Sequence, residues 1–218
     1  MPNAYRQLYR HLLAHFGPQQ WWPAKTSFEV MVGAILTQNT AWTNVEKAIA
    51  NLLTSNALSP ESIIALSDDE LASIIRPSGY FNIKARRLKH LCHWLQQQGG
   101  ELVLRQWDDQ RLREGLLGVN GIGPETADDI LLYAFGRPIF VIDAYTRRLF
   151  ARLGLATGQE TYDHLRLQVE AAFAGDKDAV SVFNELHALI VIHAKLFCRK
   201  RPQCTGCPLQ EGCTYDDQ

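Results

Sequence analysis

The sequence predicts an all-α protein, and three observations carry the prediction. Apolar side chains recur with a helical period through most of the 218 residues. Helix start signals precede several of these stretches, as in Thr26 with Glu29 and Ser67 with Glu70. The one strand-like run, residues 139–142, is too short to form a sheet by itself. We therefore expect helices joined by short turns.

The expected helices are set by their apolar faces and by the residues that begin and end them. Behind Thr26, the stretch 28–39 is apolar nearly all round, which predicts a buried central helix. Ser59-Pro60 opens a later helix, and Gly99-Gly100 ends a long one. In chain order, periodicity predicts further helices at 5–16, 42–53, 83–98, 109–116, from 124 onward, and at 144–153, 160–174 and 178–197.

The composition indicates a soluble globular chain, with 46% hydrophobic and 21% charged residues. We expect no membrane partner, because no apolar run approaches the roughly 20 residues that cross a bilayer. The first residues, MPNAYRQLYRHL, lack the apolar region of a signal peptide, so the expected location is cytoplasmic. The net charge of −1 gives no global signal for binding a polyanion.

Basic residues are nevertheless grouped along the chain. A local basic face is what DNA binding would require of a nearly neutral protein. Each group alone is explained as well by a solvated helix face. The groups are Lys84, Arg86, Arg87 and Lys89; Arg147 and Arg148; and Lys195, Arg199, Lys200 and Arg201.

The stretch 116–143 is the most informative part of the chain. It opens with three glycines, Gly118, Gly121 and Gly123, and Pro124 suits the first position of the helix that follows. Backbone N–H groups ahead of a helix N-terminus can bind an anion such as a DNA phosphate. The stretch closes on one carboxylate, Asp143, after the apolar run 139–142.

These residues resemble a known family. GVNGIGPETAD followed by FVIDAYTRR is similar to the helix-hairpin-helix, Gly/Pro…Asp superfamily of DNA glycosylases, the endonuclease III group, from about Phe28 to Cys213. The resemblance implies two helical domains with an active-site cleft between them, residues 24–136 and residues 1–23 with 137–218. It also implies a monomer that acts on double-stranded DNA containing a damaged base, associated with the nucleoid. Asp143 matches the catalytic carboxylate.

One departure from the family bears on the type of reaction. Bifunctional members carry a lysine after the hairpin that forms a Schiff base with the sugar, and the matching residue here is Glu125. No lysine lies between Lys89 and Lys177. Water should then be the nucleophile, with Asp143 stabilising the positive charge that develops on the sugar. Asp143 could also serve as a helix N-cap, and Glu125 as an ordinary carboxylate in a first helical turn.

The resemblance also implies DNA contacts. Gln38 matches the residue that fills the gap left by the flipped nucleotide, and Tyr80 matches the wedge inserted into the opposite strand. Either could instead be a plain surface or packing residue. The other expected DNA contacts are Gly118, Gly121, Gly123, Lys84, Arg147, Arg199 and Lys200.

Aromatic residues suggest the substrate. Trp21-Trp22-Pro23 and Trp42 resemble the 3-methyladenine glycosylase branch, which brings aromatic side chains to a flat pocket at these positions. An alkylated purine carries positive charge, and each good contact with an indole face is worth about 0.5–2 kcal/mol. We expect Glu125 beside this pocket. Core packing is the alternative for the tryptophans.

Four of the five cysteines, Cys198, Cys204, Cys207 and Cys213, fall within 16 residues. Four thiolates suit either a tetrahedral zinc or an iron–sulfur cluster, and their spacing alone favours neither. The family's C-terminal loop holds a [4Fe–4S] cluster, with one more residue between its first two cysteines. We expect that cluster, with zinc as the alternative. Cys92 is expected to be a buried structural thiol.

The function predicted is a monofunctional glycosylase for alkylated purines such as 3-methyladenine. Among DNA glycosylases, the alternative is an endonuclease III-like enzyme for an oxidised pyrimidine or a mismatched thymine. From another class, the alternative is a non-catalytic helix-hairpin-helix DNA-binding protein, which would need the hairpin but not a buried carboxylate after it.

Overall fold

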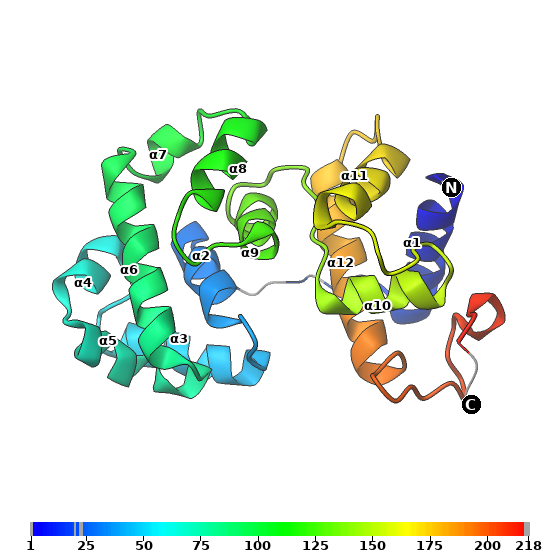
Figure 1. Cartoon of the computed structure of the whole chain (residues 1–218), viewed down its shortest axis with the longest axis horizontal. Coiled ribbons are helices and arrows are strands. Elements are labelled where there is room, and N and C mark those ends of the chain that lie inside the picture. Colours follow the sequence, from blue (N-terminus) through cyan, green and yellow to red (C-terminus); the bar gives the residue numbers. More distant parts are fainter. Residues whose placement is uncertain (1, 20, 22–23, 216–218) are drawn as a thin grey trace. The chain divides into compact units, whose positions relative to one another are not determined.

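The computed structural model describes residues 2–19, 21 and 24–215. These residues form helices and turns, and no β-strand occurs among them, so the all-α prediction is confirmed. The chain divides into two compact units: a terminal unit of residues 1–23 with 138–218, and a central unit of residues 24–137. Figure 1 labels the helices of both.

The central unit is built around the apolar helix that the sequence predicts, α2 (Ser27–Leu36), in which every residue from Val30 to Leu36 is buried. Thr26 caps it by accepting a hydrogen bond from the Glu29 amide at 3.1 Å. The return bond of the expected capping box is displaced by one residue, because the Glu29 carboxylate accepts from the Lys25 amide instead. The next helices are α3 (Trp42–Thr54), α4 (Pro60–Ala65), α5 (Asp68–Ile74) and the 3₁₀ turn η1 (Arg76–Ser78).

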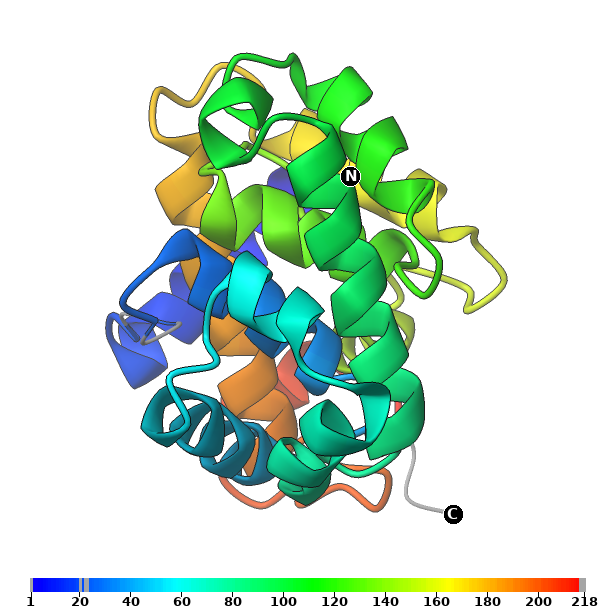
Figure 2. The ribbon, with the colours of Figure 1, turned by 90° about the vertical axis from the view of Figure 1, so that its left-hand side faces the viewer.

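The longest helix of the central unit is α6 (Phe81–Gln97), which packs against α2, α4 and α5 (Figures 1 and 2). Its buried side chains are those expected from the period, with the exception of Lys84. A single helical turn, α7 (Glu101–Leu104), follows where the sequence pattern indicated only a connection. Helix α8 (Asp109–Leu117) then leads to the glycine-containing turn.

The helix after this turn changes its hydrogen bonding part-way. It begins as α9 (Pro124–Asp129) and continues as a π-helical segment, η2 (Ile130–Ala134). Gly136 ends it with a left-handed φ of 63°, as expected of a C-terminal glycine. The change to π geometry was not predicted, because the apolar period of these residues is the same in both helix types.

The terminal unit consists of α1 (Pro2–Phe16), α10 (Ala144–Arg152), α11 (Tyr162–Ala172), α12 (Ala179–Leu196) and the short turn η3 (Gln210–Gly212). Helix α1 packs against α11 and α12, and α10 packs against α12. The core contains stacked and edge-on aromatic rings, including Phe140 with Phe183 at 5.6 Å between centroids.

Helix α12 bears on the expectation that the chain has no membrane partner. It has 18 residues and a mean hydropathy of 1.3, so by length and composition it could cross a membrane. It is not an uninterrupted apolar run, because Asn184, Glu185 and Lys195 lie within it. Half of it is buried inside the structure, as in the core helix of a globular protein.

Candidate functional site

The glycine-containing turn joins α8 to α9 in the central unit. Val119 and Ile122 are buried, each 5% exposed. Gly121 has a left-handed φ of 94°, and a Cβ there would lie 2.3 Å from Cγ of Arg87, so two constraints require glycine at this position. Gly123, in contrast, has open space where a Cβ would be. The N-terminus of α9 is therefore open to an approaching group.

A buried ion pair holds the two helices around this turn. The guanidinium of Arg113 on α8 donates to both carboxylate oxygens of Asp128 on α9, at 2.7 and 3.2 Å. The Asp128 side chain is fully buried. Removing one partner of such a pair is costly, since it leaves a buried charge uncompensated. The pair therefore fixes α9 relative to α8.

Gln38 contacts the turn directly. Its amide nitrogen donates to the Gly121 carbonyl at 3.1 Å and to the Thr126 hydroxyl at 2.9 Å. Its amide oxygen accepts from Arg87 of α6. These hydrogen bonds hold the Gln38 side chain in one position beside the turn that is predicted to bind phosphate.

Tyr80 is displayed at the start of α6. Its side chain is 67% exposed, and its backbone has a left-handed φ of 47°. Such a φ is uncommon for a bulky residue and persists only where the surroundings impose it. The ring that the family resemblance implies as a wedge is therefore exposed on a constrained backbone.

Lys84 does not have the exposure expected of a phosphate contact. It is 1% exposed, and its ammonium donates three hydrogen bonds within the central unit. The sequence pattern placed it with the surface lysines and arginines because charged residues are seldom fully buried. The prediction that it binds DNA phosphate is corrected to a buried structural role.

Asp143 precedes α10 in the terminal unit and caps it. Its Oδ1 accepts from the Thr146 amide at 2.7 Å, and its Oδ2 lies 3.6 Å from Nε2 of His187. Burial acts to raise the pKa of Asp143, but His187 and the Thr146 amide outweigh it and hold the pKa below its usual value. The carboxylate is therefore ionised at neutral pH although it is mostly buried.

His187 was missed by sequence reasoning. It lies on α12, is 5% exposed, and packs edge-on to Phe140 at 6.4 Å between ring centroids. The signal that could have found it is a polar side chain on the buried side of a strongly apolar helix, since such a group usually has a partner. His187 and Asp143 are 44 residues apart in the sequence, so no local sequence pattern predicts their contact.

The predicted pocket residues fall in different parts of the chain. Trp21 belongs to the terminal unit, where the ammonium of Lys195 lies 5.5 Å from its ring. Trp42 and Glu125 belong to the central unit, at the first residue of α3 and in the exposed first turn of α9. Trp22 and Pro23 lie outside the described residues.

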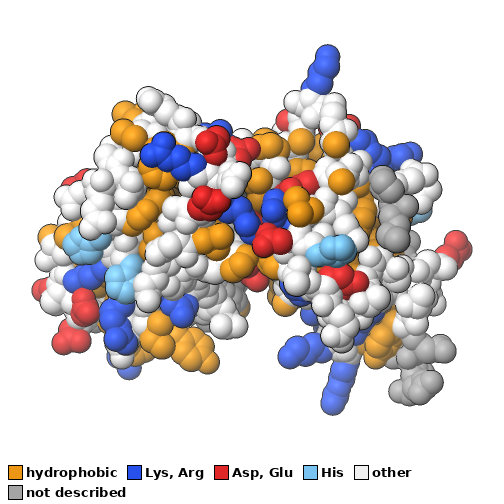
Figure 3. Space-filling model, turned by 45° about the horizontal axis from the view of Figure 1, so that its top comes forward, with side chains coloured by type: hydrophobic (Ala, Val, Ile, Leu, Met, Phe, Trp, Pro, Cys, Tyr) orange, Lys and Arg blue, Asp and Glu red, His pale blue; other side chains and the backbone are white. Residues whose placement is uncertain are grey.

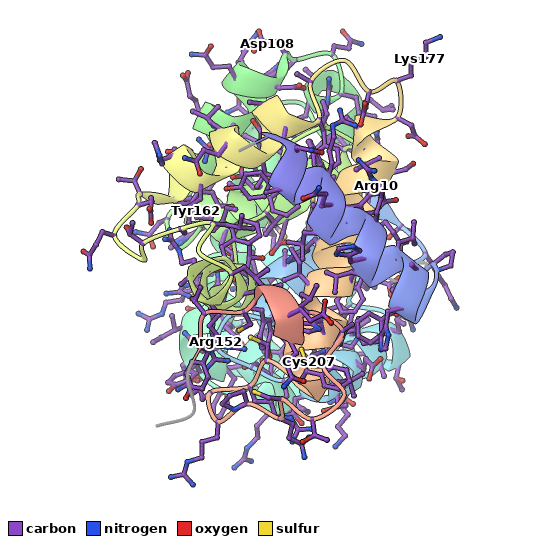
Figure 4. All side chains as sticks on the ribbon, turned by 90° about the vertical axis from the view of Figure 1, so that its right-hand side faces the viewer. Arg10, Asp108, Arg152, Tyr162, Lys177 and Cys207 are labelled. Carbon is purple, nitrogen blue, oxygen red and sulfur yellow. The ribbon has the colours of Figure 1, made fainter. Side chains whose placement is uncertain are left out.

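The four C-terminal cysteines line one small pocket, together with residues of α10 and α12. Burial raises the pKa of the Cys207 thiol, and the three other cysteines add to the rise. The guanidinium of Arg152 donates to Sγ of Cys198 at 3.1 Å and to the carbonyls of Arg199 and Lys200. Figure 4 shows the sulfur atoms beside Arg152 and Cys207.

The four cysteines match the donor set of the group that the sequence implies. Four sulfur atoms around a single pocket are chemically suited to a [4Fe–4S] cluster or a zinc ion. In the described part of the chain, no three His, Cys, Asp or Glu side chains are already arranged as a metal site. The four donors that either group needs therefore line one pocket. Cys92 is buried elsewhere, and burial raises its pKa to about 12, as expected of a structural thiol.

The remaining basic residues differ in their availability. Arg199 and Lys200 are exposed at the end of α12, whereas Arg147 is half-buried and donates to the Glu160 carbonyl at 3.0 Å. In Figure 3, Lys and Arg side chains are interspersed with Asp and Glu side chains on the drawn surface of each unit. This mixture agrees with the net charge of −1.

Comparisons with known proteins give the family. The profile described as HhH-GPD superfamily base excision DNA repair protein matches residues 32–174. A protein of Methanocaldococcus jannaschii, provisionally named a DNA repair glycosylase, is 45% identical over 210 residues, covering 95% of this chain and 94% of that protein. Endonuclease III of Sulfolobus acidocaldarius is 28% identical over 190 residues, covering 86% and 82%.

Solved structures agree. The 3-methyladenine DNA glycosylase MagIII of H. pylori, bound to 1,N6-ethenoadenine, superposes with a TM-score of 0.75 at 30% identity, covering 89% of this chain and 96% of that one. An endonuclease III in a non-covalent complex with DNA superposes with a TM-score of 0.81 at 22% identity, covering 98% and 95%, which shows the shared fold. The chain therefore belongs to the HhH-GPD superfamily of base excision DNA repair glycosylases and is endonuclease III-like.

Proposed function

We propose that this DNA repair glycosylase is monofunctional and releases alkylated purines, such as 3-methyladenine, from double-stranded DNA. The observation that carries the proposal is Asp143, a mostly buried carboxylate held ionised beside His187. Breaking the glycosidic bond builds positive charge on the sugar, and a desolvated carboxylate stabilises that charge much more than an exposed one would.

Water is the proposed nucleophile. Residue 125 is a glutamate where a Schiff-base mechanism needs an amine, and no lysine lies between Lys89 and Lys177. Asp143 can then orient the attacking water and accept its proton as the base leaves. The products are a free base and an intact strand with an abasic site, so strand cleavage requires a separate step.

The alkylpurine substrate is proposed on two grounds. MagIII of H. pylori, a 3-methyladenine glycosylase, is 30% identical over most of both chains. Trp21 and Trp42 offer indole faces, and the contact between Trp21 and the Lys195 ammonium is already of the cation–π type. A positively charged purine could replace such a contact, and its weakened glycosidic bond needs little acid assistance.

DNA binding is proposed to run through the α8–α9 turn, with Gln38 and Tyr80 entering the duplex. Arg199 and Lys200 would add contacts to phosphates. Cys198, Cys204, Cys207 and Cys213 would hold a [4Fe–4S] cluster, which fixes the C-terminal segment when bound. Arg152 ties that segment to α10 through its three hydrogen bonds.

A second candidate is a glycosylase for an oxidised pyrimidine or a mismatched thymine, because several relatives at 26–28% identity are named endonuclease III. A panel of duplexes, each with one lesion, separates the candidates. The products are scored for free base directly, and for strand breaks with and without alkali. Release of methylated purines with alkali-dependent breaks supports the proposal, whereas release of oxidised pyrimidines or mismatched thymine alone would favour the second candidate.

A further inference from the structure

Lys84 is a buried ammonium held by oxygen atoms alone. Its Nζ donates to the Leu36 carbonyl at 2.8 Å, the Thr40 hydroxyl at 2.8 Å and the Ser78 carbonyl at 2.7 Å. No ion pair to a carboxylate is found for it within the described residues. Three donors meeting three oxygens satisfy the ammonium fully, which is how a buried cation without a counterion can be tolerated.

The three oxygens come from two segments of the central unit, residues 36–40 and residues 78–80. Leu36 is the last residue of α2, and its carbonyl is one of the groups that a helix C-terminus leaves unpaired. A positive charge is favoured there by the helix dipole. Ser78 closes η1, two residues before Tyr80. The Thr40 hydroxyl accepts from Lys84 and donates to the Ser78 carbonyl, which joins the two segments a second time.

Each segment carries one residue that is proposed to enter the duplex. Gln38 follows α2 and is held on its other side by the Gly121 carbonyl and the Thr126 hydroxyl. Tyr80 follows Ser78. Both segments also contain a non-glycine residue in the left-handed region, Asn39 with a φ of 54° and Tyr80 with a φ of 47°. Asparagine enters this region readily, whereas a bulky residue such as Tyr80 stays in it only where neighbouring contacts impose it.

We propose that Lys84 is a positioning residue that fixes the Gln38 and Tyr80 segments relative to each other, so that both side chains enter the duplex in register and extrude the target nucleotide. The inference rests on the proposed function in one respect, since it takes Gln38 and Tyr80 as the inserting residues. It assigns Lys84 no contact with phosphate. A lysine suits the place because its ammonium can aim one donor at each of three oxygens, whereas the planar fork of arginine cannot.

The test compares Lys84→Met with Lys89→Met. Lys89 lies on the same helix, but its ammonium pairs with Asp68 at 2.8 Å. Extrusion is measured by the fluorescence of 2-aminopurine placed beside an unpaired target nucleotide, and the salt dependence of duplex binding is measured in parallel. For Lys84→Met we expect extrusion to fall about 10- to 100-fold while the slope of log K against log salt is unchanged. Lys89→Met should retain wild-type extrusion.

Two results would overturn the proposal. If Lys84→Met reduced the slope of log K against log salt by about one unit, Lys84 would contact a phosphate instead of holding the two segments together. Wild-type extrusion by a folded Lys84→Met would show that the two segments do not need it. Because this readout follows extrusion and not base release, it remains decisive even if the protein releases no alkylated purine.

A milder variant covers the case in which Lys84→Met does not fold. Thr40→Val removes one acceptor of the ammonium and the second link to Ser78. Thr54→Val is its control, since the Thr54 hydroxyl donates within α3, to the Ala50 carbonyl at 2.9 Å. We expect Thr40→Val to reduce extrusion by a smaller factor with the salt slope unchanged. Equal extrusion by the two valine variants would contradict the proposal.

Discussion

Nε2 of His187 lies 3.6 Å from Oδ2 of Asp143, and both side chains are mostly buried in the terminal unit. The other carboxylate oxygen accepts from the Thr146 amide at 2.7 Å. Each oxygen of the proposed catalytic group therefore has a neighbour that acts to lower the pKa of Asp143. This arrangement favours the ionised carboxylate in a place where burial alone would favour the neutral acid.

The stability of the protein should depend on the ionisation of Asp143. The folded state lowers the pKa of this group from its ordinary value of 3.8, so its contribution is complete above about pH 4 and is lost as the pH falls through the lower folded value. Asp143→Asn should be less stable than wild type at pH 6, and the difference should narrow below pH 4. Denaturant unfolding between pH 3 and pH 6 measures the free energy of unfolding of wild type and of Asp143→Asn.

The control for that comparison is Asp108→Asn. Asp108 caps α8 through the same kind of bond, to the Arg111 amide at 2.8 Å. Asparagine is as good an N-cap as aspartate, so neither substitution should remove the cap itself. A constant difference between Asp143→Asn and wild type at every pH would mean that the ionised carboxylate contributes nothing to folding.

The absence of a lysine at position 125 predicts the outcome of borohydride reduction on abasic DNA. Wild type should form no covalent complex, because there is no amine at the position where a Schiff base would form. Glu125→Lys places an amine at this position, so we expect borohydride to trap this variant on abasic DNA and not the wild type. Efficient trapping of wild type would mean that another amine attacks the sugar, and the hydrolytic mechanism would then be wrong.

The tryptophan variants test the alkylpurine pocket. Trp42→Ala and Trp21→Ala should reduce release of 3-methyladenine, each contact being worth about 0.5–2 kcal/mol, while binding to an abasic-site analogue changes little. A packed tryptophan behaves differently, since truncation costs about 3–5 kcal/mol of stability and harms every activity together. Trp107→Ala supplies that comparison, because Trp107 packs edge-on to Trp94 at 6.3 Å. Normal release by both pocket variants would leave the alkylpurine assignment without support.

The C-terminal cysteines predict a metal content. Protein purified without oxygen should be yellow-brown and contain about four irons per chain, which is the content of a [4Fe–4S] cluster. Cys204→Ser should lose iron, whereas Cys92→Ser should keep it, since Cys92 is buried in the central unit. Stoichiometric zinc in a colourless protein would identify zinc as the metal instead.

Helix positions followed from the sequence because periodicity and caps are local. Ser67 and Glu70 form the reciprocal capping box that was expected, and Gly136 adopts the left-handed cap. The π-helical segment Ile130–Ala134 was missed, since the same apolar residues suit either helix type. The segment packs against α2, a long-range contact that no local pattern contains.

The candidate site was only partly predictable. Asp143 follows a recognisable turn and helix, but its partner His187 is 44 residues away on another helix, and only the fold brings them together. The prediction for Lys84 was wrong because the local sequence suggests an exposed side chain where the fold buries it. A lysine in a basic stretch indicates a solvated surface, and its burial depends on three oxygens from distant segments. Long-range polar contacts of this kind leave no spacing signal.

The most direct test of the account is release of 3-methyladenine from a duplex under single-turnover conditions, without alkali, by wild type and Asp143→Asn. Wild type should release the free base and leave the strand intact. Asp143→Asn should bind the same duplex but release base about 10²- to 10³-fold more slowly. Release by the variant at the wild-type rate, or strand cleavage by wild type without alkali, would contradict the account.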